Sequence, residues 1–191
     1  MSSYIFVSPG SDPGAGLPLV DPILTAAKPT MGTCRPDLRR MVTPGDHIFV
    51  ISGSRGLRHQ QYVIGGMEID EKLEDQLEAL RRHPQNALRF VGEQKEGNII
   101  ALPNGAQHPR DNHSGFDRRI KNYVIGKNAV VLQTPAEVTL GRQRSVDILS
   151  EIFDRKGDRV QHIVGRNRKL TDIQTERLLE ALKEIKREAV L

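Results

Sequence analysis

The chain has 191 residues and a mass of 21.4 kDa, which is room for one domain of ordinary size. Its 28 basic and 24 acidic residues give a net charge of +4, so an anionic partner is permitted but not demanded. The single cysteine excludes an internal disulfide framework and a multi-cysteine zinc site, and no apolar run is long enough to span a membrane.

The first residues, MSSYIFVSPG, lack the cationic stretch and long apolar run of a secretory signal. We therefore expect a cytoplasmic protein with no membrane partner. Nucleotide-cofactor motifs are also absent, because Pro18 and Pro22 fall where the helix after a dinucleotide-binding loop would run. No cofactor is expected.

The first half of the chain predicts short elements separated by loops. Residues 4–7 are β-branched and aromatic and predict a strand. Residues 8–36 contain six prolines and four glycines, which exclude a long helix and favour a binding loop. Residues 35–42 predict a short helix with proline in its first turn, and a turn then leads to a buried strand over 47–51.

The middle of the chain alternates strand and helix signals. Residues 61–69 predict a strand, in which the paired glycines 65 and 66 indicate a bulge or a close backbone approach. Leucines at i, i+4 and i+7 predict a helix over 71–82, and a short strand is expected over 98–102. Residues 122–125 and 129–133 are expected to pair as a hairpin.

The C-terminal third is helical. Residues 144–153 place apolar side chains on one face, and Thr171 with Gln174 forms a capping box that starts a second helix. The apolar stripe of that helix, with Leu182 at its centre, should pack on the body or pair two copies in a homodimer. We predict one domain over 1–170 with the 171–191 helix packed on it, and an α+β fold class.

Two groups of residues could carry chemistry. Cys34 stands beside Arg35, with Arg39 further along the same predicted helix, and neighbouring cations would lower the thiol pKa; a small half-buried residue is the alternative. His108 and His113 share a polar loop with Asp111. That loop could serve a metal, but no third histidine is near, so an exposed or hydrogen-bonded loop without metal is expected.

Basic residues cluster in three places. Arg35 and Arg39 precede the strand over 47–51 and Arg55 follows it, so they would grip a phosphate bidentately if they converge. Arg118, Arg119 and Lys121 follow the second long loop, and residues 141–169 hold eight bases against four acids. The alternative is arginines scattered over the surface.

Residues 33–54 resemble the nucleotide-modification-associated domain family of phages and bacteria. The matching residues are Cys34, Arg35, Pro36, Leu38, Arg39, Gly45, Asp46, Ile48, Gly53 and Ser54. The resemblance covers residues 4–75 and is loose beyond them, where the expected aromatic end of a late strand is replaced by Leu-Gln-Thr-Pro. The Gly-Asp turn before a strand also resembles the wider PUA, ASCH and EVE grouping. The resemblance implies a PUA-like small β-barrel or curved mixed sheet with flanking helices.

The resemblance further implies a binding module for modified nucleotides or modified bases in nucleic acid, linked to DNA modification or phage defence. The expected binding residues are Arg35, Arg39, Gly53, Ser54, Arg55, Asn98 and His113. One alternative is an enzyme acting on nucleotides or nucleic acid with Cys34, Asp46 and His113 as its active groups. Another is a protein-interaction module that uses the C-terminal helix.

Overall fold

The computed structural model describes residues 2–54 and 60–190. The chain forms two compact units that interleave along the sequence. Unit 1 comprises Met1–Leu19, Asp46–Glu68 and Asn128–Leu191, and unit 2 comprises Val20–Gly45 and Ile69–Lys127. Strands β4 (Val63–Asp75) and β7 (Lys121–Val131) each contribute residues to both units.

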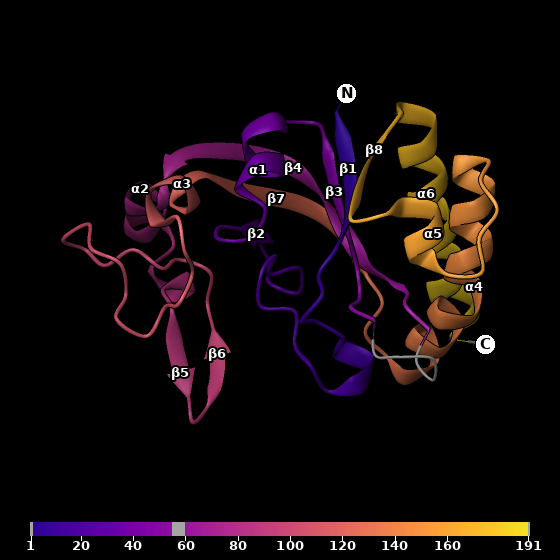
Figure 1. The fold of residues 1–191 in the computed structure, drawn as a ribbon, viewed down its shortest axis with the longest axis horizontal. Coiled ribbons are helices and arrows are strands. Elements are labelled where there is room, and N and C mark those ends of the chain that lie inside the picture. The colour runs from indigo at the N-terminus through magenta and orange to yellow at the C-terminus, as the bar shows by residue number, and fades with distance from the viewer. Residues whose placement is uncertain (1, 55–59, 191) are drawn as a thin grey trace. The chain divides into compact units, whose positions relative to one another are not determined.

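The α+β class and the mixed sheet are confirmed, whereas the β-barrel, the other predicted form, is wrong: the described strands form an open six-stranded mixed sheet in the order β2-β7-β4-β3-β1-β8 (Figure 1). The remaining strands of this sheet are β1 (Ser3–Val7), β2 (Thr30–Met31), β3 (His47–Ile51) and β8 (Asn167–Leu170). β1 runs parallel to β3 and antiparallel to β8. The end strand β2 has only two residues, both buried, and its Thr30 also bridges to Ile23, whereas the end strand β8 carries Arg168 and Lys169, charged residues typical of an edge open to water.

The described part of unit 1 carries three α-helices, which lie beside one another in Figure 1: α4 (Pro135–Phe153), α5 (Val160–Val164) and α6 (Asp172–Glu188). A short 3-10 helix, Pro13–Ala15, precedes them in the chain. The capping box at Thr171 is confirmed, and a second one at Thr134 starts α4 nine residues earlier than predicted. Leu178, Leu182 and Ile185 are buried, so the stripe of α6 is covered within unit 1 and offers no exposed apolar face.

The glycine pair in β4 behaves as predicted. The register of β3 against β4 shifts between Val50 and Ile51, which is a bulge. A Cβ atom at Gly65 would lie 2.3 Å from the Val130 carbonyl oxygen, so no larger residue fits that close approach.

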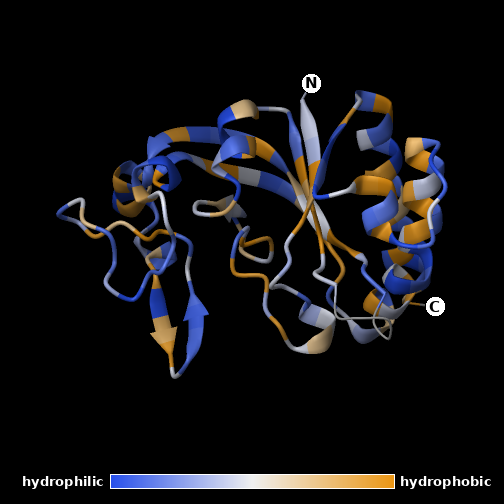
Figure 2. Ribbon diagram, viewed as in Figure 1, coloured by the Kyte–Doolittle hydropathy of each residue, from blue (hydrophilic) through white to orange (hydrophobic). Residues whose placement is uncertain are grey.

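Unit 2 contains helices α1 (Pro36–Met41), α2 (Gln76–Arg82) and α3 (Phe116–Arg119), the 3-10 helix Pro84–Asn86 and a hairpin of β5 (Arg89–Val91) and β6 (Gln94–Glu96). Its apolar core includes Leu73, Ala79, Ile99, Tyr123 and Ile125. The hairpin lies apart from that core, and Figure 2 shows β6 as hydrophilic along its length.

Three predicted elements of this region differ from the structure. The helix expected over 71–82 begins only at Gln76, because the Asp75 side chain caps it by accepting from the N–H groups of Leu77 and Glu78. Residues 98–102 form isolated bridges instead of a strand. The hairpin expected at 122–133 is one continuous strand, β7, in which Asn128 adopts a φ of 49° without reversing the chain.

None of the helices in the described part of the chain is both long and apolar enough to cross a membrane.

Candidate functional site

The predicted binding residue Arg39 is a buried structural residue. Its side chain is fully buried, and its guanidinium donates to the carbonyl oxygens of Cys34 (3.0 Å), Asn122 (2.8 Å), Arg119 (2.7 Å) and Lys121. Burial lowers its pKa to about 10, although nearby carboxylate charge favours the cation. Arg39 therefore ties α1 to the chain around α3 and is not available to a phosphate.

Arg35, a second residue of the expected phosphate grip, is paired with a neighbouring carboxylate. Arg35 donates to the Asp37 carboxylate through Nε (3.0 Å) and Nη2 (2.6 Å), the surface pairing that competes with phosphate binding. Arg55 lies outside the residues that the structure describes. Gly53 and Ser54 belong to unit 1, where the Gly53 N–H donates to the Ser11 carbonyl at 2.7 Å.

Asn98 also has a structural role. Its amide nitrogen donates to Asp21 Oδ1 at 2.8 Å, and its Oδ1 accepts from the Tyr123 hydroxyl at 2.9 Å. The buried Asp21 carboxylate in turn accepts from the N–H groups of Gly32 and Thr33, each at 2.9 Å, and from the Cys34 N–H. This network fixes the loop that leads into α1.

The environment of Cys34 does not favour a reactive thiolate. Burial raises the pKa of the Cys34 thiol to about 12, and the Asp21 carboxylate acts in the same direction. Arg119 and Arg39 oppose this rise but do not cancel it. The sequence-based expectation of a lowered thiol pKa is therefore wrong, because desolvation outweighs the neighbouring cations.

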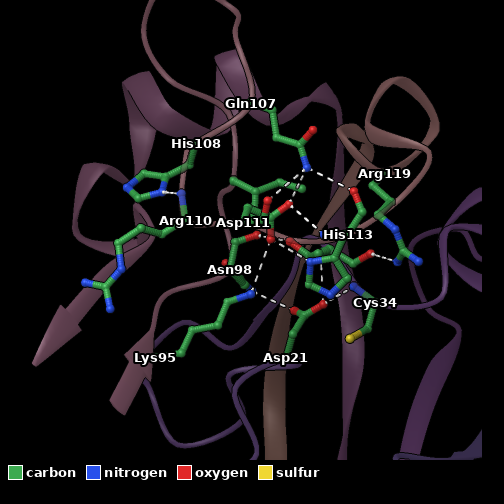
Figure 3. A network of polar contacts seen from close by, with 12 residues as sticks. Asp21, Cys34, Lys95, Asn98, Gln107, His108, Arg110, Asp111, His113 and Arg119 are labelled. Carbon is green, nitrogen blue, oxygen red and sulfur yellow. Dashed lines mark hydrogen bonds and ion pairs between the residues drawn. The ribbon is translucent and has the colours of Figure 1, made fainter. Parts of the chain in front are cut away.

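Of the proposed trio of Cys34, Asp46 and His113, the structure pairs His113 with a different carboxylate. Asp46 belongs to unit 1, where it is buried and accepts from the Ser2 N–H. The carboxylate beside His113 is Asp111, whose Oδ1 lies 2.6 Å from His113 Nδ1 (Figure 3). Asp111 and His113 are close in sequence and lie in one predicted loop, but nothing in the sequence favours Asp111 over Asp46 as the carboxylate partner of His113.

Asp111 is held as an anion at the centre of the loop. Its side chain is fully shielded, and it accepts from Gln107 Nε2 at 2.7 Å as well as from His113. Burial opposes its ionisation, yet these hydrogen bonds lower the pKa of Asp111 below its ordinary value. An anion at this position requires a proton on His113 Nδ1, so a neutral His113 ring carries its lone pair on Nε2.

Arg119, at the end of α3, joins this loop to the Cys34 loop. Its Nε donates to the Ser114 carbonyl at 2.8 Å, and its Nη1 donates to the Thr33 carbonyl at 3.2 Å. Figure 3 shows His113, Arg119 and Cys34 on one side of Asp111, and His108 and Arg110 on the other.

The second side of the loop meets the β5–β6 hairpin. Phe90 and Lys95 lie opposite each other in the hairpin. The Arg110 guanidinium carbon lies 3.6 Å from the centroid of the Phe90 ring, and Lys95 Nζ lies 3.4 Å from Asp111 Oδ1. Arg110 and Asp111, which are consecutive in the loop, thus contact Phe90 and Lys95, which face each other across the hairpin. Phe90 orients Arg110 by a cation–π contact.

His108 completes the exposed end of this arrangement. Its ring centroid lies 6.3 Å from that of Phe90, with the two planes 35° apart. Its Nδ1 accepts from the Arg110 N–H at 3.2 Å, so the Nε2 of a neutral ring carries the hydrogen and can act as a donor. We define Phe90, Arg110 and His108 as the stacking cluster; the sequence reasoning considered the loop's histidines but missed Phe90 and Arg110.

The described residues contain no group of three histidine, cysteine, aspartate or glutamate side chains able to hold a metal ion. No protein-family model matches the chain, and no curated protein or solved structure is significantly similar to it.

Proposed function

We propose that the protein is a nucleotide-binding module and that the stacking cluster receives the base. The carrying observation is the Arg110 guanidinium on the Phe90 ring, because Arg110 is exposed and forms no ion pair with a described residue. One face of the guanidinium covers Phe90, and a base can stack on the other. Its N–H edge and the His108 Nε2–H can donate to a phosphate.

The surroundings favour an anion over a neutral ligand. Lys95 is the cation balanced by Asp111, which leaves Arg110 as the unbalanced charge beside Phe90. The resemblance at residues 33–54 makes modified nucleotides, free or in nucleic acid, the first ligands to test.

Calorimetric titration with nucleoside monophosphates tests this proposal. Arg110→Ala should weaken binding by about 1–3 kcal/mol, the usual loss when a stacking partner of a base is removed. Arg81→Ala is the matched control, because Arg81 is an exposed arginine of the same unit without an ion pair to a described residue. Equal affinity of wild type and Arg110→Ala would reject the site.

A second candidate, an enzyme acting on nucleotides, is favoured by one observation: the shielded Asp111 orients His113 as a general base would be oriented. This version keeps His113 but replaces Cys34 and Asp46 with Asp111. It predicts turnover of a nucleotide or oligonucleotide that is lost in His113→Ala and reduced in Asp111→Asn. If the wild-type protein binds a nucleotide but does not turn it over, the enzyme proposal is rejected and only the binding-module proposal stands.

A further inference from the structure

A second basic region lies in unit 1, away in sequence from the stacking cluster. We call it the basic strip, and it consists of Arg155, Lys156, Arg159, Arg166, Arg168 and Lys169. These six cations fall within fifteen residues that contain one acid, Asp158. The strip runs from the end of α4, past α5, into the edge strand β8 (Figure 1).

The cations of the basic strip are available to a partner. Five of them are exposed, and Arg168 is half-buried with its guanidinium carbon 5.1 Å from the centroid of the Phe153 ring. None of the six forms an ion pair with a residue that the structure describes. Two exposed arginines of α6 differ: Arg177 pairs with Glu151 at 2.6 Å and Arg187 with Glu180 at 2.7 Å.

Backbone geometry holds the strip together. A Cβ atom at Gly157 would lie 2.8 Å from the His162 Cβ, so the loop bearing Lys156 packs directly on α5. Gly165, with a φ of 71°, ends α5 and turns the chain into β8. β8 pairs with β1 along one side only, which leaves the strip at an open edge of the sheet.

We propose that the basic strip binds the sugar–phosphate backbone of nucleic acid. Four of its six cations are arginines, whose planar donors match phosphate oxygens. The exposed large hydrophobic residues in the described part of unit 1 are Ile173 and Val190. Neither is aromatic, and neither belongs to the strip. The strip itself therefore lacks the apolar anchor of a membrane-binding surface, and its exposed cations contact phosphates of any sequence.

This inference rests on the proposed function for the class of ligand, because it extends a nucleotide-binding module to polymeric nucleic acid. The two sites have separate tasks. The stacking cluster would take one base, and the basic strip would hold backbone phosphates.

The test measures affinity for a 20-base-pair DNA duplex and for AMP over a series of salt concentrations. The strip variant is Arg155→Ala, Lys156→Ala and Arg159→Ala together, all at exposed positions. The control is Arg177→Ala, Lys183→Ala and Arg187→Ala together, which removes the same charge from exposed positions of α6. In a log–log plot of duplex affinity against salt concentration, the strip variant should have a slope smaller in magnitude by roughly 0.9 for each phosphate that it no longer neutralises. The control variant should keep the wild-type slope. The affinity for AMP should be unchanged in both variants.

The inference would be overturned if the strip variant kept the wild-type salt slope. It would also be overturned if the control variant reduced the slope as much as the strip variant does. Binding to phosphatidylserine vesicles without binding to the duplex would also overturn it in favour of a membrane surface. Failure of the proposed function looks different: the wild type would then not bind AMP, while the duplex would still bind with a slope that depends on the strip.

Discussion

At the residue scale, the structure assigns opposite roles to arginines that look alike in sequence. Arg39 is fully buried and donates only to backbone carbonyls, whereas Arg110 is exposed and stacks on Phe90. The difference comes from what surrounds each guanidinium: loop carbonyls converge on Arg39, and the hairpin offers Arg110 an aromatic face. Ligand binding is therefore expected at Arg110 and not at Arg39.

Arg39→Ala should destabilise the protein by about 3 kcal/mol or more, because it removes a fully buried side chain and the charged donor that four backbone carbonyl groups share. Chemical denaturation measures the change. Arg40→Ala on the exposed side of α1 is the control and should stay within about 0.5 kcal/mol of wild type. A stable Arg39→Ala protein with weakened nucleotide binding would restore Arg39 to the binding site.

Cys34 should react slowly with iodoacetamide at neutral pH. With its pKa raised to about 12, the thiolate fraction at pH 8 is on the order of 10⁻⁴, and the rate should rise about tenfold per pH unit from pH 8 to 10. The unfolded protein is the control, because its thiol has the ordinary pKa of about 8.5. A rate that levels off below pH 8 in the native protein would show a reactive thiolate.

At the element scale, α6 joins unit 1 through its buried stripe. Leu182 is 2% exposed, and Lys186 Nζ donates to Glu137 of α4 at 2.7 Å. This arrangement follows from an amphipathic helix that must cover its apolar side.

Leu182→Ala should lower the free energy of unfolding by about 2–5 kcal/mol, since it opens a cavity between buried side chains. Ile173→Ala on the same helix is the matched control, because Ile173 is 70% exposed and should change stability little. Thermal melting of both variants measures the difference. An unchanged melting temperature for Leu182→Ala would contradict the packing of α6.

The elements that could be predicted from sequence are those with a local signal. Pro36 marks the start of α1, the Thr171 capping box marks α6, and the glycine pair marks the bulge in β4. The missed features depend on distant partners. β1 pairs in parallel with β3 across a connection of 39 residues, and no local pattern distinguishes that arrangement from the expected barrel.

The candidate site was harder to predict for the same reason. The loop that holds His108 and His113 was recognisable by its composition. The contact of Arg110 with Phe90 requires the β5–β6 hairpin, which is only three residues long on each side and has no strong strand signal. The burial of Arg39 depends on carbonyl groups about 80 residues further along the chain, which spacing within one helix does not reveal.

At the scale of the whole molecule, the modest net charge of +4 hides an uneven distribution. Most charges of α6 are paired or balanced along the helix, whereas the basic strip holds six cations against one acid. A polyanion responds to such local density more than to net charge.

We expect nucleic acid to copurify with the protein at low salt and to separate at about 1 M salt, where the Debye length falls to about 3 Å. The ratio of absorbance at 260 and 280 nm before and after the salt wash measures this, and mass spectrometry of the released material identifies the bases. Bound material that survives 1 M salt would indicate that burial, not charge, dominates its binding.

Stacking of a base on Arg110 is the central claim. Titration of isotope-labelled protein with a nucleoside monophosphate, followed by NMR, tests it most directly. We predict that the ring current of the base moves the Arg110 Nε–H resonance and the Phe90 and His108 ring resonances together, with one saturation curve. Saturable binding that leaves these three residues unshifted while resonances elsewhere move would contradict base stacking at this cluster.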